Sequence, residues 1–168
     1  PFVRESMKQF TDNVTTGSDI WGGEIALLEE QMNEKQDIQE RIKVIEKFLL
    51  QRLNRQYDFE NISNCVRLVL HKKGILKVDE LAYSAHLSLR QLERKFRENI
   101  GLSPSQFTRI IRMHNAVKDI GHSRLSELCY EYEYTDQSHF IKEIKFFTGV
   151  TPKKINTGEG CFAHPAFL

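Results

Sequence analysis

One predicted helix, beginning near residue 89, carries polar side chains that can pair with the edges of nucleic-acid bases. Its polar face holds five such residues: Arg90, Gln91, Glu93, Arg94 and Arg97. Leu92, Phe96 and Ile100 recur at i, i+4 and i+8 and must pack inward, which leaves the polar set exposed. Arginine can pair bidentately with guanine, and glutamine with adenine. A helical face of this composition suits the reading of a DNA major groove.

A second predicted helix, further along the chain, has a comparable face. Phe140, Ile144 and Phe147 are expected to point inward. The residues left outside are Ser138, Ile141, Lys142 and Lys145. Ile141 is apolar on a face that should be wet. It could contact a thymine methyl group or cover neighbouring apolar surface, and the sequence favours neither interpretation.

The two helices belong to an internal repeat. Glu80-Leu81-Ala82 matches Glu127-Leu128-Cys129 at an offset of about 47 residues. Gly101-Leu102-Ser103-Pro104 matches Gly149-Val150-Thr151-Pro152 one residue later, so the second copy has gained a residue inside its second helix. Each copy consists of a short helix, a turn of about four residues and a capped helix, which is the pattern of a helix-turn-helix.

A helix over about 104–121 is expected to join the copies. Ser103 can cap it, Pro104 suits its first position, and Gln106 follows the cap by three residues. Such a helix spans about 25 Å at about 1.5 Å per residue. The two exposed faces would then lie on the order of 34 Å apart, about one turn of B-DNA, and both could enter successive major grooves.

Residues from about 77 to 155 resemble the C-terminal DNA-binding domain of the AraC/XylS-type transcription regulators. The segments that carry the resemblance are Leu81-Ala82, Leu87 to Phe96, Gly101 to Pro104, Tyr134 to Phe140, and Phe147 to Pro152. In such regulators, residues early in both recognition helices read bases. The resemblance thus implies base-reading roles for Arg90, Gln91, Arg94, Gln137, Ser138, His139 and Lys142. It implies double-stranded DNA as the partner, and RNA polymerase and a second copy of the chain as further candidate partners. It also implies a cytoplasmic location, at the bacterial nucleoid.

The chain departs from this family in the turn of each unit. The family commonly has glycine there, whereas His86 and Glu133 occupy these positions here. Histidine tolerates a left-handed backbone moderately and glutamate poorly. We therefore expect the second turn to be either strained or reshaped.

The sequence as a whole predicts an all-α fold in three parts. Residues 1–56 more weakly resemble the end of a regulator's effector or oligomerisation region, and we expect them to be the helical remnant of that N-terminal region. Residues 57–156 form the DNA-binding domain, with helix-turn-helix units at about 60–101 and 124–148. Residues 157–168 form a loosely ordered tail.

An alternative function is a helical protein-interaction or dimerisation module that does not read DNA. The apolar stripe from Ile38 to Leu53 could be intrachain core or a dimer seam. The net charge of +1 is weak support for a polyanionic partner by itself. A salt titration separates the two functions, because only DNA binding weakens steeply with salt.

The sequence gives little support for an enzyme, a metal-binding protein or a membrane protein. Six histidines are scattered without a metal-binding pair at i, i+4, and Cys65, Cys129 and Cys161 share no metal-ligand spacing. Neither a phosphate-binding glycine loop nor a nucleophile motif occurs. We therefore expect no enzyme activity, no cofactor and no metal. The apolar runs are too short to cross a membrane.

Overall fold

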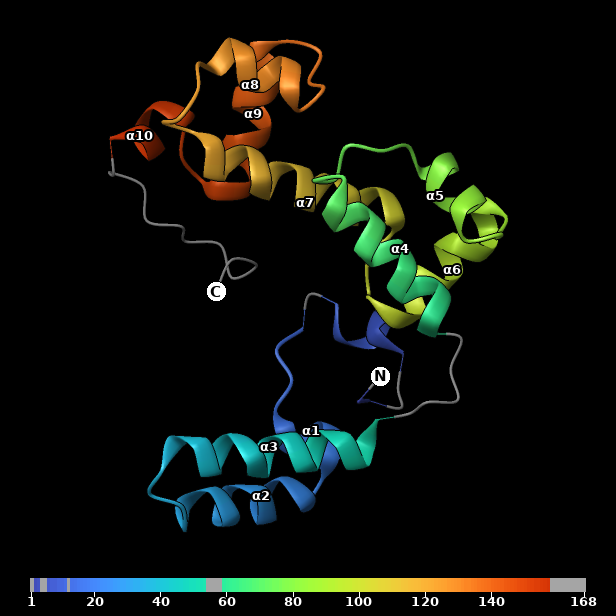
Figure 1. Ribbon diagram of the computed structural model, residues 1–168, viewed down its shortest axis with the longest axis vertical. Helices are drawn as coiled ribbons and strands as arrows, with labels where there is room; N and C mark the ends of the chain where they lie inside the picture. The colour runs from blue at the N-terminus through green and yellow to red at the C-terminus, as the bar shows by residue number, and fades with distance from the viewer. Residues whose placement is uncertain (1, 4–5, 12, 54–58, 158–168) are drawn as a thin grey trace. The chain divides into compact units, whose positions relative to one another are not determined.

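The computed structural model describes residues 2–3, 6–11, 13–53 and 59–157 of the 168-residue chain (Figure 1). That part is helical and contains no strand, which confirms the predicted all-α fold. In chain order the elements are η1 (Met7–Phe10), α1 (Gly17–Trp21), α2 (Glu24–Asn33), α3 (Ile38–Arg52), α4 (Phe59–His71), α5 (Val78–Ser84), α6 (Leu89–Asn99), α7 (Pro104–Asp119), α8 (Leu125–Glu131), α9 (Gln137–Thr148) and α10 (Pro152–Asn156).

Contacts between Cα atoms divide the chain into two compact units. Unit 1 comprises residues 1–64 and 87–103, and unit 2 comprises residues 65–86 and 104–168. The boundary that the sequence predicts near residue 57, and the predicted loose tail after residue 157, both lie outside the described residues. The three-part division therefore stays a prediction.

In unit 1, α2 and α3 form a helical hairpin whose helices lie side by side (Figure 1). The edge of Trp21 meets the ring of Phe48 with 5.5 Å between centroids, and Phe48 is buried. The predicted stripe on α3 is only partly covered, because Ile38 is 68% exposed and Ile42 is 42% exposed. The intrachain-core interpretation therefore does not account for these two isoleucines within the described residues.

The end of α6 is also held within unit 1. Thr11, just after η1, donates its hydroxyl proton to the carbonyl oxygen of Gly101 at 2.9 Å. Gly101 has a left-handed backbone with φ of 84°, and a Cβ there would lie 2.8 Å from the Thr11 Oγ1. Glycine is therefore required where α6 ends.

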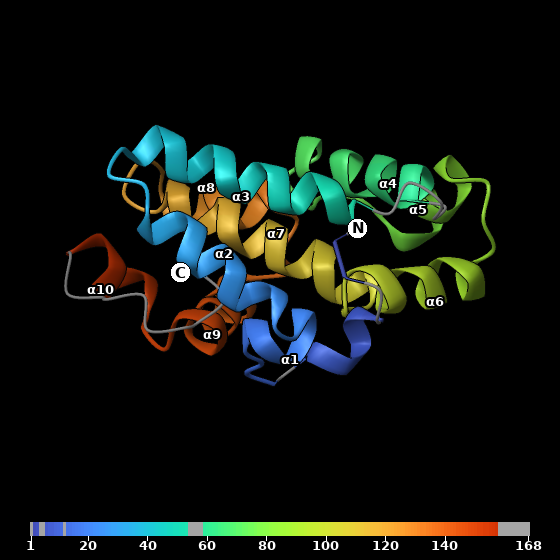
Figure 2. The same ribbon diagram turned by 90° about the horizontal axis from the view of Figure 1, so that it is seen from below.

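Unit 2 is built on α7, with α8, α9 and α10 gathered at the C-terminal end of that helix (Figure 2). Its core is a cluster of side chains that are nearly or fully buried: Met113, Ala116, Leu128, Cys129, Tyr132, Tyr134, Phe140 and Ile144. They come from α7, from α8 and the turn after it, and from α9. Burying one side chain of the size of Phe140 contributes about 2–3 kcal/mol. This apolar cluster fixes which face of α9 remains outside.

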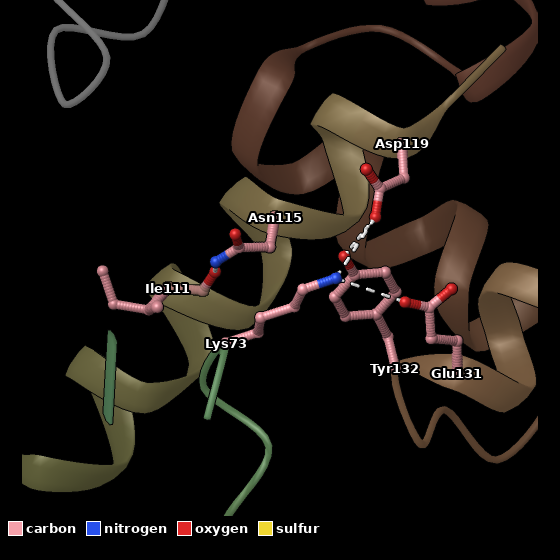
Figure 3. A network of polar contacts seen from close by, with 6 residues as sticks. All are labelled: Lys73, Ile111, Asn115, Asp119, Glu131 and Tyr132. Carbon is pink, nitrogen blue, oxygen red and sulfur yellow. Dashed lines mark hydrogen bonds and ion pairs between the residues drawn. The ribbon is translucent and has the colours of Figure 1, made fainter. Parts of the chain in front are cut away.

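A polar network connects Lys73, in the segment that follows α4, with α7 and with α8 (Figure 3). Lys73 Nζ lies 3.3 Å from Glu131 Oε1 and 3.8 Å from Asp119 Oδ2. The hydroxyl of Tyr132 donates to Asp119 Oδ2 at 2.5 Å. Burial, reinforced by the Asp119 carboxylate, raises the pKa of Tyr132 above its usual range. The Tyr132 phenol thus stays protonated and remains a donor to Asp119.

The turns of the two helix-turn-helix units have the backbone that the sequence suggested. His86, between α5 and α6, has φ of 54°, and Glu133, between α8 and α9, has φ of 51°. Both residues are therefore left-handed at positions where the Cβ atom is unfavourable. The strain expected for Glu133 is present, and the turn has not been reshaped to avoid it.

This geometry predicts that Glu133→Gly stabilises the fold by about 0.5–1 kcal/mol, because glycine adopts a left-handed backbone without steric cost. Urea unfolding monitored by circular dichroism measures the change. The matched control is Lys145→Gly in the exposed face of α9, which should destabilise by about 1 kcal/mol. An equal loss of stability in both variants would contradict the strain at Glu133.

Candidate nucleic-acid interface

The predicted reading face of α6 is exposed. Leu92 and Phe96 are fully buried, so the opposite side of the helix faces outward. The exposed members of the predicted set are Arg90, Gln91, Arg94 and Arg97, while Glu93 is half-buried. The structure therefore presents all five predicted residues along one side of the helix, with the arginines outermost.

Two of these arginines are paired with carboxylates of the same helix. Arg94 Nη1 lies 3.4 Å from Glu98 Oε1, and Arg97 Nη2 lies 2.9 Å from Glu93 Oε1. Exposed pairs at i, i+4 contribute only about 0.3–0.5 kcal/mol. A phosphate or a guanine edge can therefore replace Glu93 or Glu98 at little cost, and Arg90 has no ion pair with the described residues.

Gln91 has a structural role that competes with base reading. Its Oε1 accepts from the backbone N–H of Ser88 at 2.9 Å and from the Ser88 hydroxyl at 2.9 Å. Ser88 Oγ in turn accepts from the Gln91 N–H, which completes a capping box at the start of α6. Pairing with adenine uses both the oxygen and the amino group of a glutamine. Gln91 would have to release this cap in order to read a base fully.

The face of α9 is similarly placed. The exposed members of the predicted set are Gln137, Ser138, His139 and Lys142, and Ile141 is half-buried. Asp136 caps the helix by accepting from the backbone N–H of His139 at 2.8 Å. The half-burial of Ile141 is compatible with both of its proposed roles, so the choice between them stays open.

Glu143 is a buried carboxylate on α9 that the sequence analysis did not identify. Its side chain is 4% exposed, and its Oε1 lies 3.3 Å from Arg109 Nε and 3.9 Å from Arg112 Nη2, both on α7. The hydroxyl of Tyr134 donates to the same oxygen at 3.3 Å. Burial, followed by the Glu143 charge, raises the pKa of Tyr134 to about 12. The available signal was that Glu143 follows Phe140 by three residues and thus lies on the inward face.

The described residues offer no metal-binding arrangement. They include no group of three or more histidine, cysteine or acidic side chains that could hold a metal. Cys65 and Cys129 are free and buried, and desolvation raises the pKa of both thiols. They therefore fit the predicted role of small core residues. Within the same part of the chain, every helix is too short or too polar to cross a membrane.

Part of the chain is similar to known helix-turn-helix proteins. A family model described as a helix-turn-helix domain matches residues 81–157. The HTH-type transcriptional activator RhaS of Escherichia coli (strain SE11) is 26% identical over 121 residues, covering 68% of this chain and 44% of that protein. RhaS of Escherichia coli (strain K12 / DH10B) matches over the same shares. Residues 81–157 are therefore similar to a helix-turn-helix domain, and the relatives that match are described as transcriptional activators.

A solved structure shares the fold of a large part of this chain. It is the crystal structure of a transcriptional regulator from Chromobacterium violaceum, described as an AraC-type DNA-binding domain-containing protein. The superposition has a TM-score of 0.55 at 22% identity and covers 63% of this chain and 95% of that one. The chain spans less than half the length of the RhaS proteins that it matches.

The capping role of Gln91 and its predicted role in DNA reading can be separated by substitution. Gln91→Glu should keep the capping box, because glutamate also serves at this position, and should change stability by less than about 0.5 kcal/mol. The same variant should bind duplex DNA more weakly, because it loses the amino group and adds a negative charge. Ser88→Ala is the control that removes the cap, at a cost of about 1 kcal/mol. Thermal melts and DNA titrations of both variants distinguish the two roles. Undiminished DNA binding by Gln91→Glu would show that Gln91 only caps the helix.

Proposed function

We propose that this chain is a sequence-specific transcription regulator that reads two successive major grooves of one duplex with α6 and α9. The observation that carries the proposal is the repeated unit, in which each second helix buries an apolar face and exposes a polar one. The AraC-type match over residues 81–157 supports DNA as the partner. Helix α7 has 16 residues and is about 24 Å long. This length is compatible with the proposal that two recognition helices enter grooves about one DNA turn apart.

The charge on the two faces suits recognition of base edges together with phosphates. Arg90, Arg94 and Arg97 are the exposed cations of α6, and Lys142 and Lys145 are the exposed cations of α9. Phosphate contacts position a protein on DNA, whereas base contacts specify the sequence. We assign base reading to residues near the start of each helix, and phosphate contact to the cations nearer its end.

The direction of regulation is proposed from the relatives. The RhaS proteins are described as transcriptional activators, so we propose activation, with RNA polymerase as a further partner. A second copy of the chain is the proposed partner of α3, whose Ile38 and Ile42 are exposed. The bacterial nucleoid is the proposed location. Activation and the partners named here are proposed for the whole protein, whereas this chain matches only 44% of the RhaS sequence.

Salt dependence separates DNA reading from a protein-interaction module. A protein that makes about six phosphate contacts loses about 10³-fold in affinity between 50 and 200 mM salt. We expect a steep loss of this kind for the chain on duplex DNA, measured by fluorescence anisotropy. Binding to DNA that is absent or insensitive to salt would favour the interaction module instead.

Arg94 provides the sharpest test of base reading. Its side chain is 63% exposed, and its counterpart in the second unit is Lys142. If Arg94 pairs bidentately with guanine, Arg94→Ala should cost about 1–3 kcal/mol on the cognate site and relax the preference at one base position. Arg94→Lys should keep the charge without the fork geometry, so the preference should stay degraded.

The matched control is Lys118→Ala, which removes an exposed cation outside the proposed reading faces. Each variant is titrated on cognate and scrambled duplexes at two salt concentrations. Equal losses for Arg94→Ala on both duplexes would make Arg94 a phosphate contact. No loss on either duplex would remove it from the interface.

A further inference from the structure

Glu143 brings together side chains from α7, from the turn before α9 and from α9 itself. Its carboxylate contacts Arg109, Arg112 and Tyr134, as described above, and its Oε2 lies 3.5 Å from His139 Nε2, one turn earlier on α9. All of these residues belong to unit 2. The only member of the group with a predicted role in reading DNA is His139.

Both arginines of this group are held by more than one contact. The Arg109 guanidinium lies 4.9 Å from the ring centroid of Phe147, and the Arg112 guanidinium lies 4.7 Å from that of Tyr134. The Nε of Arg112 is buried without a hydrogen-bond partner among the described residues. A buried ion pair with an unsatisfied donor is weak evidence for a stabilising role, because apolar residues of similar volume often serve stability equally well. The network therefore calls for a different function.

The geometry of the network restricts how α9 can turn about its own axis. A rotation of α9 would separate the Glu143 carboxylate from Arg109 and Arg112 and leave a buried charge without partners, which is strongly unfavourable. The same rotation would move every outward side chain of α9 relative to a DNA groove. The pairing of Glu143 with α7 therefore fixes the direction in which α9 presents its reading face.

His139 is oriented by the same carboxylate. Its Nε2 faces Glu143, and its ring meets the ring of Tyr134 edge to face, with 5.5 Å between centroids. The imidazole is about half exposed. With Nε2 directed at Glu143, Nδ1 is the ring nitrogen left to meet a base or a phosphate.

The first helix-turn-helix unit has a different residue at the position of Glu143. By the repeat that pairs Arg94 with Lys142, the residue equivalent to Glu143 is Lys95, which has the opposite charge. The helix-turn-helix fold therefore does not require a carboxylate here. We propose that Glu143 is a positioning residue for DNA recognition, which locks the rotation of α9 on α7 and directs His139 toward the duplex. This inference rests on the proposed function.

The test compares Glu143→Gln with the wild-type chain on a duplex selected by the wild type and on two derivatives, each with one half-site scrambled. Glu143→Gln should lose about tenfold or more of the discrimination at the half-site read by α9 and keep that at the half-site read by α6. Glu133→Gln, which neutralises an exposed carboxylate in the same unit, is the control and should keep both. The ¹⁵N resonances of the His139 imidazole should shift in Glu143→Gln and not in the control.

A second variant separates positioning from stability. Replacing the network with apolar residues (Arg109→Met, Arg112→Leu and Glu143→Leu together) should keep or raise the melting temperature, yet fail to restore discrimination by α9. Wild-type discrimination in this variant would show that the network is not needed to position α9 and would overturn the proposal. Unchanged discrimination in Glu143→Gln would overturn it as well, while the proposed function would stand. A wild-type chain that selects no sequence would overturn both.

Discussion

The burial of one apolar face on α6 and one on α9 is the constraint on which the rest of the structure depends. Leu92 and Phe96 on α6, and Phe140 and Ile144 on α9, have no exposed surface. Because a helix repeats every 3.6 residues, this burial determines which side chains remain outside. The three arginines of α6 are exposed for this reason, and the ion pairs along its surface are too weak to determine their direction.

Much of this arrangement could be predicted from the sequence, because it depends on local patterns. The spacing of Leu92 and Phe96, the cap at Ser88, and the left-handed positions of His86 and Glu133 are all properties of short segments. Glu143 could not be assigned in the same way. A single charged residue on an inward face is interpretable only when its partners are known, and Arg109 and Arg112 lie about 30 residues earlier in the chain.

Helices α6 and α9 are held in place by different kinds of contact. Helix α6 starts with a reciprocal capping box, and the residue after Ile100 is held by Thr11. Helix α9 follows a turn that contains a strained glutamate, and a buried ion-pair network connects it to α7. Electrostatic restraint by Glu143 thus accompanies the less favourable of the two turns.

The central claim is that both helices engage one duplex at the same time. Hydroxyl-radical footprinting of the chain on its selected site tests this most directly. The account predicts protection of a contiguous or nearly contiguous site of about 15–20 base pairs, with two protected groove segments about one DNA turn apart. Protection over only half of that length, or no site-specific protection, would contradict it.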